Sequence, residues 1–377
     1  MATTRVYLDH NATTPILPVV RAAVVEAFDQ VGNPSSVHRD GAGARRVVDQ
    51  ARDRVAELVG APAGEVVFTS GGTEANNLAL LGFDRRVIVS AIEHDSVMAP
   101  ARLARTGCSV VPVDSNGVVD LDALESVLSA DPNALLSLML ANNETGVRQP
   151  VREAAELAHR QGALVHCDAV QGPGKLPLDM ADLGVDLLTV SAHKFGGPTG
   201  VGALIVRSGL NVAPRQVGGG QEGYRRAGTP NVSGIAGFGA AAQWLFENRG
   251  LDVASVARQR DRLEAACSEF GAAVFGAGAP RLANTSCLTM PGVSSETQIM
   301  AFDLDGIAVS AGAACSSGKV GPSHVLAAMG VSDDVAGSAI RVSLGRDTSE
   351  ADVDRFIEAW KTLYERKHAD LSRRLAS

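Results

Sequence analysis

Aromatic side chains and clusters of basic residues are scarce in this chain of 377 residues. Aromatics make up 4% of it and glycine supplies 40 residues, so the core must depend on aliphatic side chains. The 34 Lys and Arg are scattered and the formal net charge is -8, which disfavours a nucleic-acid partner. Hydrophobic residues still reach 45%, which excludes an intrinsically disordered chain.

Long apolar runs and paired cysteines are also missing. No run approaches the roughly 18 residues of a membrane-spanning helix, and Met1–Arg5 lacks the features of a signal peptide. We therefore expect a cytoplasmic protein without membrane contact. The 5 cysteines are odd in number and include no C-x-x-C spacing. The sequence thus predicts neither a disulfide framework nor a metal site.

Short β-branched runs alternate with helical stretches between residues 65 and 206. This alternation predicts an α/β fold, with a mainly parallel sheet and helices on both faces. Beyond Gly250 strands become fewer and helices longer. We expect a large domain, 15–250, and a smaller α+β domain formed by 1–14 and 251–377. The predicted strands are Val6–Leu8, Val66–Thr69, Val87–Ser90, Val110–Val113, Ala134–Leu140, Ala163–Asp168, Leu187–Val190 and Gly202–Val206.

Polar residues follow several of these strands, at the sheet edge where open parallel sheets bind ligands. Val66–Thr69 runs into a Ser-Gly-Gly-Thr-Glu turn, in which Gly72 and Thr73 begin a helix. Free N–H groups at such a helix start suit an anion, so the turn is a candidate phosphate site. An ordinary strand-to-helix turn is the alternative. No Walker lysine follows, which disfavours ATP or GTP.

An acid and a lysine follow two consecutive predicted strands. Asp168 ends one strand, and a buried carboxylate there requires a cation, a helix cap or a salt bridge. Lys194 follows the next strand beside His193 and two glycines, where desolvation would favour a Schiff-base amine over a solvated surface lysine. A phosphate site, an acid and a lysine together describe a site for pyridoxal 5'-phosphate (PLP).

Nine segments, in order from Tyr7 to Arg346, resemble the cysteine desulfurases of the NifS and IscS type. They are YLDHNATTP, GNPSSVH, TSGGTEANNLAL, ANNETG, HCDAVQ, SAHKFGGPTG, RRAGTP, SAGAACSSG and IRVSLGR. These are fold-type I PLP enzymes of the class V aminotransferase group. The resemblance implies a homodimer that converts L-cysteine to L-alanine. It also implies that sulfur passes as a persulfide to an acceptor protein, for iron-sulfur clusters or other sulfur-containing biomolecules.

The resemblance implies roles for the cofactor-binding residues. Lys194 would form the internal aldimine with PLP, Asp168 would pair with the pyridine nitrogen, and Gln171 would hydrogen-bond the ring hydroxyl. His94 would stack on the ring and move protons; a structural histidine is the alternative. The residues implied to hold the phosphate are Gly72, Thr73, Ser191, His193 and, reaching the neighbouring subunit's site, Thr229.

The substrate-binding residues are also implied by the resemblance. Arg341 would grip the α-carboxylate through two parallel hydrogen bonds, rather than close a strand as an exposed arginine. Asn143 would lie near the ring hydroxyl and the substrate. Asn11 would help to bind the same carboxylate.

Cys315 differs from the other thiols because its surroundings are small residues with little to pack. We expect a mobile loop at about 310–321 that carries it. The resemblance implies that Cys315 attacks the substrate sulfur. Since an ordinary thiol is mostly protonated at neutral pH, it needs activation, for which His94 is one candidate. The other four are expected to be buried small hydrophobes: Cys108, Cys167, Cys267 and Cys287.

Three other functions stay open. A selenocysteine lyase or a class V aminotransferase could use the same scaffold, and a non-catalytic scaffold could bind sulfur-pathway partners. A transaminase needs no loop thiol, so Cys315 favours sulfur chemistry. The set of Lys194, Asp168, His94 and Cys315 disfavours a silent scaffold.

Overall fold

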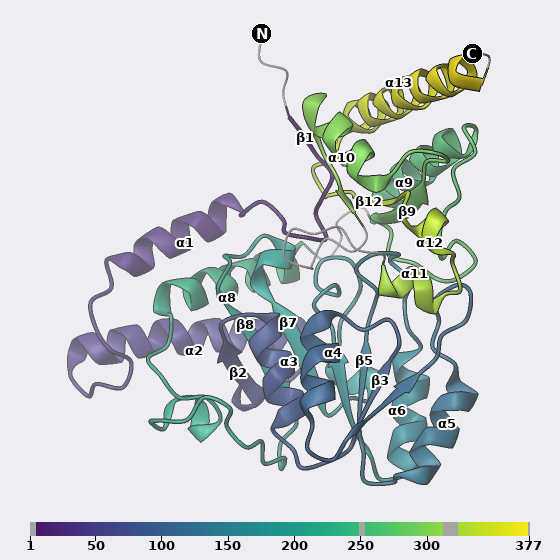
Figure 1. Ribbon diagram of the computed structural model, residues 1–377. Coiled ribbons are helices and arrows are strands. Elements are labelled where there is room, and N and C mark those ends of the chain that lie inside the picture. The colour runs from purple at the N-terminus through teal and green to yellow at the C-terminus, as the bar shows by residue number, and fades with distance from the viewer. Residues whose placement is uncertain (1–4, 249–252, 312–322, 376–377) are drawn as a thin grey trace.

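A seven-stranded sheet forms the centre of the larger body in the computed structural model, which describes residues 5–248, 253–311 and 323–375 (Figure 1). Its strands are β2 (Val66–Thr69), β3 (Val87–Ser90), β4 (Cys108–Val111), β5 (Leu135–Met139), β6 (Leu164–Asp168), β7 (Leu187–Ser191) and β8 (Gly202–Val206). Their order is β2-β8-β7-β6-β5-β3-β4. Strands β3 to β7 are parallel, and β8 is antiparallel to both neighbours. The predicted mainly parallel α/β fold is confirmed.

Helices cover both faces of this sheet because successive strand residues point to opposite sides. Leu78 packs with Val67 and Val89 on one face, whereas Phe238 packs with Phe68 on the other. The helices are α1 (Pro18–Phe28), α2 (Arg39–Val59), α3 (Gly72–Leu81), α4 (Asp95–Leu103), α5 (Leu121–Ala130), α6 (Val151–Arg160), α7 (Met180–Leu183) and α8 (Val232–Glu247). Every residue of β5, β6 and β7 is buried, as expected for a sheet covered on both sides.

A second, smaller body carries the remaining strands and helices and lies against the end of the large sheet (Figure 1). Its strands are β1 (Val6–Tyr7), β9 (Thr285–Thr289), β10 (Ile307–Ala308), β11 (Ser310–Ala311) and β12 (Ala339–Ser343). Its helices are α9 (Val253–Ser268), α10 (Ser295–Leu304), α11 (His324–Ala328), α12 (Asp333–Ala336) and α13 (Glu350–Leu375). Among the helices of the described ranges, none has both the length and the hydropathy needed to cross a bilayer.

The smaller body has its own hydrophobic core. The rings of Phe302, Phe356 and Trp360 pack together, with centroids 5.1 to 6.2 Å apart. Val6 and Leu8 join this core, because β1 pairs in parallel with β10. The segment that begins with β1 thus packs with residues about 300 positions later in the chain. The expected division into two domains assigns both segments to the small domain, and this division stays a prediction.

Two expectations from the sequence are wrong in detail. Ser310 and Ala311, expected in the mobile loop, form β11, since they pair with Arg341 and Ile340 of β12. Cys108, expected to be buried, is half-buried because it lies on β4, the edge strand of the large sheet. The rest of the predicted loop, 312–321 with Cys315, lies outside the described residues.

Candidate active site

A cavity of about 300 Å³ lies at the carboxyl ends of β6 and β7. Asp168 is the last residue of β6, and Ser191 is the last residue of β7. Lys194 follows in a short 3-10 turn, Ala192–Phe195. The predicted site residues that line this cavity are Asn11, Gly72, Thr73, His94, Asn143, Asp168, Gln171, Ser191, His193, Lys194 and Arg341.

The amine of Lys194 is held by main-chain carbonyls of the segment that follows β1. Its Nζ donates to the carbonyl oxygen of Asn11 at 2.7 Å and to that of Ala12 at 3.0 Å. The lysine is thus anchored by neutral acceptors between the large sheet and the smaller body. Such contacts position an amine without neutralising a charge on it.

Asp168 belongs to a hydrogen-bonded chain that reaches His94. Asn76, on α3, donates from Nδ2 to Asp168 Oδ2 and to Ser96 Oγ, both at 2.8 Å. Ser96 Oγ lies 2.8 Å from His94 Nδ1, and the Ser96 main-chain N–H donates to the same nitrogen at 3.1 Å. Because Nδ1 accepts a main-chain N–H, the neutral imidazole carries its proton on Nε2. The main-chain N–H of Val170 donates to the other oxygen of Asp168.

Other residues that line the cavity offer groups for an anion. Ser191 Oγ is buried there and has no hydrogen-bond partner among the described residues. Gly72 begins α3 nearby, and a Cβ on it would lie 3.0 Å from Val170 Cγ2, so a larger residue would crowd this wall. Burial, and then the charge of Lys194, lower the pKa of His193 to about 4. His193 is therefore neutral at physiological pH.

Arg341 enters the cavity from β12 of the smaller body. It is almost fully buried and donates from Nη2 to Asp9 Oδ1 at 2.6 Å and from Nη1 to the Asn143 carbonyl oxygen at 3.2 Å. Its Nε is buried without a partner among the described residues. The guanidinium is thus held in place by one carboxylate and one carbonyl at the wall of the cavity.

A buried carboxyl group, Glu93, lies just before His94. Its Oε1 accepts from Ser90 Oγ at 2.6 Å and from the Met139 N–H at 2.9 Å, while Oε2 has no partner in the described structure. Burial raises the pKa of Glu93 to about 8. Glu93 is therefore mostly protonated at neutral pH and adds little negative charge beneath the cavity.

Three residues of the site were missed by the sequence analysis. Asn76 and Ser96 complete the chain from Asp168 to His94. Lys175 donates to side chains that line the cavity. A signal for Asn76 existed, since it follows Thr73 by three positions and so shares its face of α3. No local pattern pointed to Lys175, because its partner Asn11 is 164 residues away.

Thr229 does not line the cavity of its own chain. It lies in a separate surface cleft, beside Ser70, Glu222 and Arg226. Its predicted contact with a neighbouring subunit's phosphate therefore depends on a second chain and stays a prediction.

Comparisons with known proteins agree with the resemblance found in the sequence. The family model described as aminotransferase class-V matches residues 6–356. A cysteine desulfurase of Cereibacter sphaeroides is 45% identical over 368 residues, 94% of this chain and 94% of that protein. The cysteine desulfurase IscS of Dictyoglomus turgidum is 38% identical, over 96% of this chain and 95% of its own. A solved NifS-like protein from Rickettsia africae has a TM-score of 0.89 at 36% identity, covering 96% of this chain and 99% of that one.

The cavity fits the PLP cofactor of this family. It combines a lysine amine, a carboxylate at a neighbouring strand end and a buried hydroxyl, Ser191 Oγ, without a partner in the described structure. These are the groups that an aldehyde, a cationic ring nitrogen and a phosphate require. The chain therefore belongs to the aminotransferase class-V family, and within it to the PLP-dependent cysteine desulfurases.

Proposed function

We propose that this protein converts L-cysteine and the thiol of Cys315 into L-alanine and a persulfide on Cys315. The substrate C–S bond breaks, an S–S bond forms, and the hydrogen lost from the thiol is balanced by one gained at the substrate carbon. The observation that carries this proposal is that Lys194, Asp168 and Arg341 line one cavity, although they come from different parts of the chain.

Lys194 and Asp168 would contact the cofactor directly and assist the reaction there. PLP, when bound, supplies an electron sink for negative charge at the substrate Cα. Asp168 would hold a proton on the ring nitrogen, since its carboxylate is already fixed by Asn76 and the Val170 N–H. Lys194 would bind the cofactor aldehyde and then, once released, move the Cα proton. Gln171 would donate to the ring hydroxyl.

The phosphate would lie between β7 and α3. Gly72 and Thr73 offer the start of α3, where main-chain N–H groups face an anion. Ser191 Oγ gains the partner that it lacks in the described structure. His193, neutral because its pKa is lowered, would donate a hydrogen bond rather than a charge.

Substrate recognition would depend on Arg341. Its guanidinium faces the cavity, and Asn143 and Asn11 line the same wall. A carboxylate bound there would take a bidentate pair of hydrogen bonds, which sets the orientation of the amino acid. His94 would cover the cofactor ring and donate from Nε2, since Nδ1 is occupied by Ser96.

Mass spectrometry of Cys315 tests the proposed reaction. After incubation with L-cysteine, the peptide that contains Cys315 should gain the mass of one sulfur atom, and a Cys315→Ala variant should still bind PLP and form no such persulfide. Cys108→Ala is the matched control, because Cys108 is half-buried on an edge strand away from the cavity. Full sulfur transfer by Cys315→Ala would refute the role of this thiol.

We further propose a homodimer in which Thr229 completes the partner's phosphate site. Phe28, Val31 and Val37, on and after α1, are largely exposed, as is Tyr224 near Thr229. Exposed apolar side chains of this size favour burial against a second copy of this chain.

Mixed dimers test this arrangement. A Thr229→Ala chain and a Lys194→Ala chain, each with impaired activity alone, should regain one intact site when they are unfolded together and refolded. If Thr229 acted within its own chain, mixing would restore nothing. Light scattering should give the mass of two chains.

The persulfide formed on Cys315 would pass to an acceptor protein, such as an iron-sulfur cluster scaffold.

A further inference from the structure

A second lysine, Lys175, shares a hydrogen-bonding partner with Lys194. Lys175 Nζ donates to Asn11 Oδ1 at 2.8 Å, whereas Lys194 Nζ donates to the main-chain oxygen of the same residue at 2.7 Å. Lys175 also donates to Gln171 Oε1, four residues earlier in the chain. The two amines thus meet at Asn11 from two sides.

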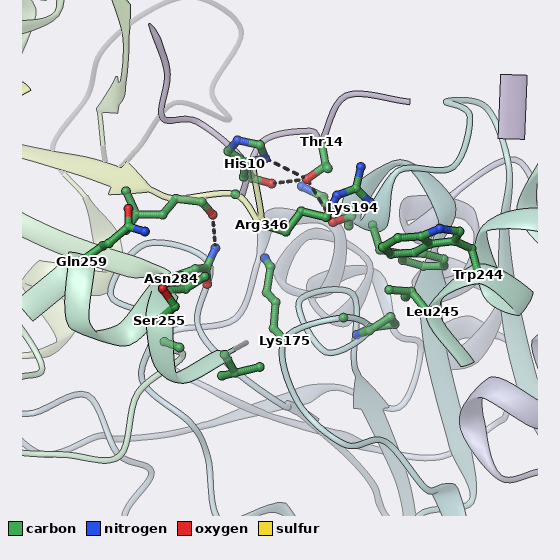
Figure 2. A pocket seen from close by; sticks show the side chains of 18 residues that line it. His10, Thr14, Lys175, Lys194, Trp244, Leu245, Ser255, Gln259, Asn284 and Arg346 are labelled. Carbon is green, nitrogen blue, oxygen red and sulfur yellow. Dashed lines mark hydrogen bonds between the residues drawn. The ribbon is translucent and has the colours of Figure 1, made fainter. Parts of the chain in front are cut away.

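Lys175 projects into a second cavity, of about 240 Å³, which lies between the two bodies and is also lined by Lys194 (Figure 2). The described residues that line it include Arg346 but no Asp or Glu. Burial, and then the charge of Lys194, hold the pKa of Lys175 well below its usual range. The same repulsion disfavours a second positive charge on Lys194.

The contact with Lys175 sets the orientation of the Gln171 carboxamide. Because Oε1 accepts from Lys175, the other end of the carboxamide is the NH₂ group, with two hydrogens to donate. One reaches the Asn11 main-chain oxygen at 3.1 Å. The second remains for a ligand in the catalytic cavity, which Gln171 lines. A reversed carboxamide would instead turn its oxygen toward that ligand.

Lys175 orients the side chain of Asn11 in the same way. Asn11 Oδ1 accepts from Lys175 and, at 3.1 Å, from Asn284 Nδ2. Its Nδ2 therefore donates to the Asn143 carbonyl oxygen and to Thr285 Oγ1. The Asn143 carbonyl also accepts from Arg341, so this network extends to the proposed carboxylate site.

We propose that Lys175 is a positioning residue for the PLP reaction, which fixes the carboxamides of Gln171 and Asn11 so that Gln171 presents an N–H group to the cofactor's ring hydroxyl. The proposal rests on the proposed attachment of PLP to Lys194. An N–H donated to the ring oxygen stabilises its anion and makes the adjoining Lys194–cofactor nitrogen less basic. Lys175 would therefore control the pH at which that nitrogen loses its proton.

The experiment is a pH titration of the visible absorption of the PLP-bound protein. Lys175→Met, which removes the amine donor and keeps most of the side-chain length, should raise the spectroscopic pKa by about one unit. The shift has this direction because a donor on the ring oxygen favours the unprotonated Lys194–cofactor nitrogen, and Lys175→Met removes the contact that orients this donor. Lys175→Arg should bring the value back toward that of the parent protein. Lys361→Met, on the exposed surface of α13, is the matched control.

A second comparison separates positioning from a general loss of structure. If Lys175 acts through Gln171, Lys175→Met should change kcat less in a Gln171→Met background than in the parent. Should Lys175→Met fail to fold, Lys175→Gln with the same titration replaces it. A spectroscopic pKa equal to that of the parent in folded, PLP-bound Lys175→Met, or in Lys175→Gln where it replaces Lys175→Met, would overturn the proposal. Borohydride trapping of PLP at Lys194 in the parent protein tests the underlying attachment separately.

Discussion

Asn76 Nδ2 lies 2.8 Å from Asp168 Oδ2, and both side chains are buried at the base of the catalytic cavity. The same amide donates to Ser96, which contacts His94. One asparagine thus connects the acid proposed to face the cofactor's ring nitrogen with the histidine proposed to cover the ring.

Replacement of Asn76 by alanine should lower kcat without abolishing PLP binding. Asp168 would lose one of its two hydrogen bonds, and a hydrogen bond to a charged group contributes about 1.5 to 3 kcal/mol. We expect kcat to fall about tenfold or more. Steady-state kinetics with L-cysteine measure this effect. Asn77→Ala is the control, since Asn77 donates to the Thr73 carbonyl within α3 and not to Asp168; an equal loss in both variants would contradict the account.

Replacement of Arg341 by lysine should mainly raise KM for L-cysteine. Lysine keeps the charge but loses the planar pair of donors, so one hydrogen bond to the α-carboxylate disappears. The expected increase in KM is about 10- to 100-fold. Arg262→Lys, whose guanidinium pairs with Asp354 on the surface, should leave KM unchanged. An unaltered KM in Arg341→Lys would remove Arg341 from the substrate site.

The buried Glu93 makes stability depend on pH in a defined direction. Its folded pKa, raised to about 8 by burial, exceeds that of the unfolded chain, so folding takes up a proton in between. The contribution of Glu93 to the free energy of unfolding is therefore complete at acid pH. It decreases as the pH rises from about 5 to 8, by on the order of 1 kcal/mol per pH unit. Glu93→Gln cannot ionise. Its melting temperature relative to the parent should thus increase from pH 5 to pH 8.

Glu125→Gln serves as the control for this measurement, because Glu125 is exposed and pairs loosely with Arg160. Both variants and the parent are compared in the same cofactor state. A difference between Glu93→Gln and the parent that stays constant with pH would show that Glu93 is already ionised in the folded protein.

The ends of β6 and β7 were predictable because the buried run of each strand stops at a polar residue. Asp168 and Ser191 close β6 and β7, and the turn after β7 carries Lys194. Parallel strands then bring these residues to one edge of the sheet without further information. Motif resemblance added Arg341 and Asn11, which reach the same cavity from the smaller body.

The remaining features depend on contacts that a single sequence does not display. Lys175 acts through a tertiary partner 164 positions away, so no periodicity marks it, and the spacing of Asn76 from Thr73 marks a helix face but not its partner Asp168, 92 positions away. The strand β11 is two residues long and exists through its pairing with β12, which is why small residues there were interpreted as loop. Cys108 is only half-buried because of its place at the sheet edge, and strand order is a property of the whole fold.

The central claim is that Lys194 is the amine that holds the cofactor. Borohydride reduction of the PLP-bound protein, followed by proteolysis and mass spectrometry, identifies the modified lysine. The account predicts that the reduced pyridoxyl group is found on Lys194 and is absent from Lys175, which lies on the other side of Asn11. A pyridoxyl group on Lys175, or on any lysine outside the catalytic cavity, would contradict it.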